Sequence, residues 1–77
     1  ELREFFDMKK KGVGSPAYKL GIHIKDYREQ KKWSQATLAN KIETDQKRIS
    51  KIETGNVYIG WDTFYKISQA LDVSIEN

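Results

Sequence analysis

The chain has 77 residues, a formal net charge of +3, one histidine and no cysteine. This length allows one small domain, and the lack of cysteine excludes disulfide scaffolds, thiol chemistry and zinc fingers. Apolar runs stay short of the roughly 20 residues that span a bilayer, and no signal-peptide pattern occurs, which excludes a membrane protein. The chain starts at Glu1 rather than at Met, so we expect a fragment or a processed form.

Residues 1–14 predict a short helical segment and a linker. Leu2, Phe5 and Phe6 are spaced as on one face of an amphipathic helix, and glycines and a proline at 12–16 then break it. These apolar side chains must dock, either on the domain's own core or on a partner subunit. The lysines at 9–11 form either a solvated helix end or an arm that follows DNA phosphates.

Four further helices are expected between residues 15 and 77, which we treat as one all-α domain. Ser15, Ser34 and either Thr44 or Asp45 are suited to cap the first three, and Gly55 suits a left-handed end of the third. The expected ranges are about 16–31, 35–42, 45–53 and 61–71. Apolar residues at helical spacing predict the core, namely Leu20, Ile24, Tyr27, Leu38, Ala39, Ile42, Ile49, Ile52, Phe64, Ile67, Ala70 and Leu71, with Val73 and Ile75 closing it.

The segment 35–53 carries the most information about function. It predicts two short helices joined by a turn that is too tight for an ordinary antiparallel hairpin, with the small Ala39 where the helices cross. Two helices held at a wide angle by a short turn form a helix-turn-helix, whose second helix enters the major groove of DNA. The polar residues of 45–51 would then project outward.

The full pattern resembles the phage-repressor (lambda repressor/Cro, or XRE-type) helix-turn-helix family. The resemblance covers roughly residues 18–76 and is carried by Leu20, Gly21, Ile24, Arg28, Ser34, Gln35, Ala36, Leu38, Ala39, Ile42, Ile49, Ser50, Lys51, Ile52, Glu53, Gly55, Trp61, Asp62, Thr63, Phe64 and the stretch 67–73. It implies a compact lambda-repressor-like bundle of four to five short helices. The fifth family helix is expected beyond Asn77.

The resemblance also implies the residues that contact DNA. Gln35 would bind a phosphate and brace the recognition helix, about 45–53. Base edges are expected to face Gln46, Lys47 and Lys51, with Ser50 near the groove and Arg48 reaching bases or flanking phosphates. The loop residues Thr54, Asn56 and Tyr58 would touch phosphate, and Arg28 and Glu53 would form a structural salt bridge. Glutamine pairs well with adenine, and lysine or arginine with guanine.

Two features depart from the family pattern. Residue 43, in the turn, is Glu where the family usually has Gly; a left-handed Glu costs roughly 1–2 kcal/mol, which argues for a different local shape of this turn. Glu43 and Asp45 oppose DNA locally, and the loop 56–60 carries no lysine or arginine.

The leading hypothesis is therefore a repressor-like transcriptional regulator that binds double-stranded DNA sequence-specifically, as a dimer on a pseudo-palindromic site. The alternative is an antitoxin-like protein-interaction module whose main partner is a toxin or an effector domain, and the two are compatible. No catalytic set, metal ligands or cofactor motif is present, so we expect no enzyme. We expect a cytoplasmic protein, bacterial or phage-encoded. Trp33 and Trp61 are expected to pack at the core or its rim, and His23 to be exposed.

Overall fold

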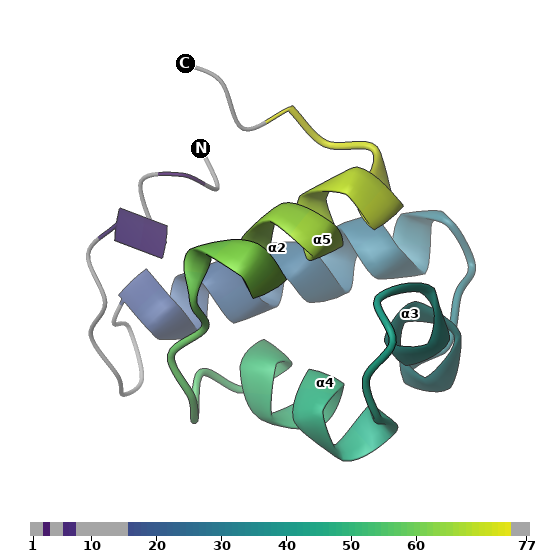
Figure 1. Ribbon diagram of the computed structural model, residues 1–77, viewed down its shortest axis with the longest axis horizontal. Helices are drawn as coiled ribbons and strands as arrows, with labels where there is room; N and C mark the ends of the chain where they lie inside the picture. The colour runs from purple at the N-terminus through teal and green to yellow at the C-terminus, as the bar shows by residue number, and fades with distance from the viewer. Residues whose placement is uncertain (1–2, 4–5, 8–15, 75–77) are drawn as a thin grey trace.

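The computed structural model describes residues 3, 6–7 and 16–74. This part of the chain contains four helices and no strand, which confirms the all-α prediction. The helices are α2 (Pro16–Gln30), α3 (Gln35–Lys41), α4 (Gln46–Glu53) and α5 (Trp61–Leu71), each within one residue of its predicted bounds. Helices α2 and α5 run side by side (Figure 1). Helix α3 lies at one end of this pair, and α4 lies along one side of it.

Two helices begin with the side-chain caps that the sequence predicts. The Ser34 hydroxyl accepts a hydrogen bond from the Thr37 backbone N–H at 3.0 Å. Asp45 Oδ1 accepts one from the Arg48 backbone N–H at 2.8 Å, so Asp45 rather than Thr44 caps α4. Each such bond satisfies one of the four N–H groups that a helix leaves unpaired at its start.

All four helices end in the same left-handed turn. The residue after the last helical turn has a positive φ in each case: 61° at Lys32, 60° at Glu43, 75° at Gly55 and 59° at Asp72. At the α3 end, the Glu43 N–H donates to Asn40 O at 3.3 Å and the Thr44 N–H to Ala39 O at 2.8 Å. This pair of bonds is the Schellman motif, which satisfies carbonyls at the helix end.

The different local shape expected for the turn at Glu43 is therefore wrong. The backbone keeps the left-handed conformation although the residue is not glycine. The reason is that two backbone hydrogen bonds and the cap of α4 by Asp45 all depend on this turn, so their combined gain exceeds the cost of one left-handed side chain.

One apolar face of each helix contributes to a single core. Five residues of this core are fully buried, and the others are only slightly exposed. The core consists of Leu20, Ile24, Leu38, Ala39, Ile42, Ile49, Ile52, Ile59, Phe64, Ile67 and Leu71, with Phe6 from the N-terminal segment. Tyr27, Trp33, Val57, Ala70 and Val73 pack against it while half-buried. Burial of each large apolar side chain contributes about 1.5–3 kcal/mol, and together they hold α4 in place.

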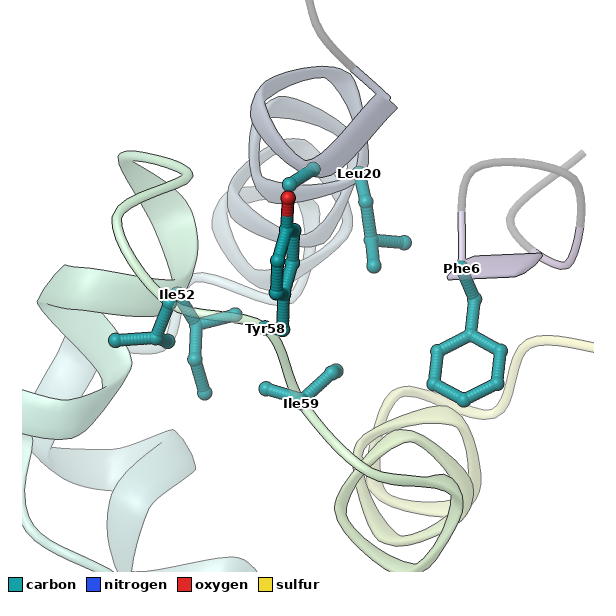
Figure 2. A pocket seen from close by; sticks show the side chains of 7 residues that line it. Phe6, Leu20, Ile52, Tyr58 and Ile59 are labelled. Carbon is teal, nitrogen blue, oxygen red and sulfur yellow. The ribbon is translucent and has the colours of Figure 1, made fainter. Parts of the chain in front are cut away.

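Phe6 docks on the domain's own core. Its ring stacks on Phe64 with centroids 4.5 Å apart and meets Trp61 edge-on at 5.8 Å. Phe6 lines a small apolar cavity of about 20 Å³ together with Leu20, Ile52 and Ile59. Phe6 and Ile52 lie on opposite sides of this space in Figure 2. Of the two docking alternatives, Phe6 therefore follows the first, which is docking on the core of its own domain and not on a partner subunit.

Several sequence predictions lie outside the described residues. They concern Leu2, Phe5, the lysine run 9–11, the cap Ser15 and the core position Ile75.

Helix α2 approaches α4 at Gly21. A Cβ atom at this position would collide with the carbonyl oxygens of Ile52 and Glu53, the latter at 2.5 Å. Only glycine allows two backbones this close. Gly21 therefore sets how deeply the C-terminal end of α4 sits against the domain.

Candidate nucleic-acid interface

Helix α3, the turn 42–45 and α4 form a two-sided unit. Ile49 and Ile52 on the inner side of α4 are buried in the core, and α4 packs against both α3 and α2. The outer side carries Lys47, Arg48 and Lys51, all exposed. Because isoleucine burial fixes the rotation of α4 about its own axis, the cationic side chains must face solvent.

A buried ion pair ties α4 to α2. Arg28 Nε donates to Glu53 Oε2 at 2.7 Å and Nη2 donates to Oε1 at 3.1 Å, so the contact is bidentate. Arg28 is 7% exposed and Glu53 5%. The third arginine nitrogen, Nη1, donates to the Trp33 carbonyl oxygen at 2.7 Å, which also fixes the chain between α2 and α3.

The hydrogen bonds that Arg28 donates to Glu53 hold the pKa of Arg28 above its ordinary value, although burial opposes this. An arginine guanidinium stays protonated in proteins, and its contact with Glu53 favours the charged form further. A charged group in this position needs its carboxylate partner, since an unpaired buried charge is strongly destabilising.

The buried pair continues outward through two glutamines. Gln35 Nε2 donates to Glu53 Oε1 at 3.0 Å, and Gln46 Nε2 donates to Gln35 Oε1 at 3.3 Å. The chain of hydrogen bonds thus starts at Arg28 on α2, crosses α3 and ends at an exposed amide in the first turn of α4. It orients the Gln35 and Gln46 amides before any ligand arrives.

Apart from Gln35 on α3, the residues predicted to contact DNA lie between positions 46 and 58. Gln46, Lys47, Arg48, Lys51, Thr54 and Asn56 are exposed, and Gln35 and Ser50 are half-buried. At the end of α4, Thr54 Oγ1 donates to Ser50 O at 3.0 Å, and Asn56 Nδ2 donates to Thr54 Oγ1 at 2.8 Å. These bonds hold the Thr54 and Asn56 side chains close to the C-terminal turn of α4.

Tyr58, the third loop residue of the prediction, is exposed over 47% of its surface and also lines the small cavity beside Phe6 (Figure 2). Its ring therefore supports the loop as well as facing solvent.

Within the described part of the chain, no three His, Asp or Glu side chains gather in a way that could hold a metal ion. His23 is exposed on α2. None of the described helices is both long and apolar enough to cross a membrane.

The sequence interpretation missed two features. The hydrogen bond between Gln35 and Gln46 joins residues 11 positions apart on different helices, and no sequence spacing signals it. The ammonium groups of Lys31 and Lys41 lie over the Trp33 ring, at 5.4 and 4.7 Å from its centroid. Trp33 itself is half-buried against the core, and Trp61 packs at its rim, 42% exposed.

A short helix packed at the core, a tight turn and a second helix with an outward polar face define a helix-turn-helix domain. Comparison with known families agrees. A family model described as a helix-turn-helix domain matches residues 21–77, and the chain belongs to this repressor-like, XRE-type family. It is a family of DNA-binding regulatory domains and not of enzymes. The curated proteins include no match to this chain.

Proposed function

We propose that this protein is a repressor-like transcriptional regulator that binds double-stranded DNA sequence-specifically, with α4 in the major groove. The observation that carries the proposal is the division of α4 into two sides. Its inner side is locked by buried isoleucines and by Glu53, while its outer side presents three cations and an oriented amide. A major groove admits one helix, and such side chains match the donors and acceptors of base edges.

The proposal assigns separate roles along this face. Gln46, Lys47 and Lys51 contact base edges, with Ser50 beside them and Arg48 reaching a base or the flanking phosphates. Gln35, Thr54 and Asn56 contact phosphates and set the register of α4 on the duplex. Arg28 and Glu53 hold these groups in place without touching DNA.

We further propose that the domain covers residues 15–77 and acts as a homodimer. One recognition helix reads only a few base pairs, so high affinity needs two copies on a pseudo-palindromic site. For each copy we expect roughly three to five phosphate contacts, with a log–log salt slope near −0.9 per contact.

Selection from a pool of random duplexes tests the proposal. One motif should be enriched, and titration of the selected duplex should give two copies per site. Lys51→Ala should relax the preference at one base position, whereas Gln35→Ala should weaken binding to all sequences alike. Lys19→Ala, at an exposed position of α2 outside the proposed interface, is the matched control. If no sequence is enriched even at low salt, specific regulation is wrong.

In the alternative hypothesis of an antitoxin-like module, the apolar N-terminal side chains are the element that docks on the partner protein. Phe6 is instead buried against Phe64 and is therefore occupied within the chain. We accordingly keep DNA as the main partner. A protein partner that survives high salt and competes with DNA would reverse this order.

A further inference from the structure

An open groove lies between α3 and α5, at the C-terminal ends of α2 and α3. It has a volume of about 720 Å³. Its apolar lining includes Trp33, Ile42, Tyr65 and Ala70. Tyr65 is 47% exposed, so a large aromatic surface is open to solvent here.

Three lysines border this groove. They are Lys31 from the end of α2, Lys41 from the end of α3 and Lys66 from α5, and one acid, Glu43, accompanies them. The ammonium groups of Lys31 and Lys41 both lie over the Trp33 ring, which holds positive charge directly above the apolar lining. Among the described residues, no salt bridge neutralises any of the three lysines.

The groove is separate from the proposed DNA interface. Its lining comes from the segment between α2 and α3, the end of α3, the turn after α3 and α5, and α4 contributes no residue to it. A ligand in the groove would therefore leave the outer side of α4 available to DNA.

We propose that this groove binds an acidic segment of a partner protein that carries a bulky apolar side chain. The carboxylates of the segment pair with Lys31, Lys41 and Lys66, and its apolar side chain covers Trp33 and Tyr65. This arrangement supplies carboxylate partners to the lysines and covers the exposed aromatic surface at once, which a neutral or a purely charged ligand does not. It gives the DNA-bound protein a means to contact another protein.

The shape and charge favour this occupant over two others. A small aromatic acid needs a cleft that encloses most of its surface, whereas this groove is open along its length. A second copy of the chain carries a net charge of +3 and would bring a second set of lysines to the contact. An extended acidic segment needs no enclosing cleft, and its charge is opposite to that of the lysines.

A titration followed by amide chemical shifts tests the proposal on the folded protein. The probe is a short acidic peptide with leucine and phenylalanine at its centre. Its controls are the same peptide with every carboxylate replaced by an amide, and one with both apolar residues replaced by serine. Saturable shifts should occur at Trp33, Lys41 and Ala70, and both control peptides should bind more weakly by about tenfold or more.

Charge reversal on the protein provides a second arm. The double variant Lys41→Glu/Lys66→Glu should bind the acidic peptide about tenfold or more weakly than the parent. In contrast, Lys19→Glu on α2 should change the affinity for the peptide by less than about twofold. Both positions of the double variant are exposed, so the fold should persist. Addition of the selected DNA duplex should leave the peptide shifts in place.

Four results would overturn the proposal. They are an absence of saturable shifts, an equal loss of binding in Lys19→Glu, shifts confined to the outer side of α4, and displacement of the peptide by DNA. Saturable binding of indole-3-acetate without binding of the peptide would assign the groove to a small acid instead. Self-association of the chain that Lys41→Glu/Lys66→Glu abolishes would assign it to a second copy.

Discussion

At the contact between α2 and α4, Gly21 leaves no space even for a methyl group, whereas between α3 and α5 the chain leaves an open groove of about 720 Å³. The first contact is also joined by the buried Arg28–Glu53 pair. The second has lysines over an exposed aromatic lining. The difference indicates that the α2–α4 contact is a fixed support and that the groove is free to accept a ligand.

The support must be rigid because α4 presents its side chains over only two turns. A shift of this helix would move Gln46 and Lys51 together relative to the bases. In contrast, Ile42 is the one groove side chain buried in the core among the described residues, and Trp33 and Ala70 are half-buried against it. Substitutions at the two places should therefore differ in both size and kind of effect.

The largest effect is expected from Glu53→Ala. It leaves the Arg28 guanidinium buried without its carboxylate, so the free energy of unfolding should fall by about 3–5 kcal/mol. DNA affinity should fall as well, although loss of an acid would raise it by simple Coulomb attraction. Urea denaturation and a DNA titration measure the two quantities.

The double variant Arg28→Met/Glu53→Leu is the control, because it removes both charges and should recover much of the lost stability. Tighter DNA binding by Glu53→Ala, with an unchanged melting temperature, would show that Glu53 is an ordinary surface acid.

Gly21→Ala should have the next largest effect. Its methyl group meets two backbone carbonyl oxygens, which cannot move aside as a side chain does. The loss of stability should be about 3 kcal/mol or more. Gly60→Ser, where an added Cβ meets nothing within 4 Å, serves as the comparison and should keep or raise the stability through an N-cap hydroxyl. Equal melting temperatures for the two variants would contradict the close α2–α4 contact.

Glu43→Gly should raise the free energy of unfolding by about 1 kcal/mol, because glycine adopts the left-handed turn without the side-chain cost. Glu43→Gln keeps the cost and removes only the charge, so its stability should stay near that of the parent. The same two variants should both bind the acidic peptide more tightly, since Glu43 is the one acid in the described lining of the groove. If Glu43→Gln were also more stable than the parent, the gain in stability would come from the loss of charge and not from the backbone conformation.

The smallest effect is expected in the groove itself. Tyr65→Ser should change the stability by about 0.5 kcal/mol or less, as at other exposed positions. Its neighbour Phe64 is fully buried, and Phe64→Ala should cost about 3–5 kcal/mol. Calorimetry on the two variants compares their losses of stability. A large difference would show that the core ends between these two adjacent residues.

Much of the fold follows from local chemistry that is visible in the sequence. The caps Ser34 and Asp45, the left-handed Gly55 and the apolar spacing around Ile49 and Ile52 are short-range signals, and they place the helix bounds within one residue. The expected pairing of Arg28 with Glu53 came from the resemblance to a family, and the structure places the two groups 2.7 Å apart.

Other features required the tertiary structure. The link from Glu53 through Gln35 to Gln46 and the docking of Phe6 on Phe64 depend on residues brought together from different elements. Intrinsic preference argued against a left-handed Glu43, but the hydrogen bonds of residues 43 and 44 to the end of α3 and the cap of α4 by Asp45 together outweigh its cost.

The sequence by itself thus determined the helices, most of the core residues and the class of protein, since these depend on periodicity and on neighbouring residues. Only the tertiary structure decided how the two sides of the domain differ. Close approach at Gly21 and the open space bordered by Trp33 and Tyr65 are properties of the distance between helices, and that distance is set by packing across the whole core.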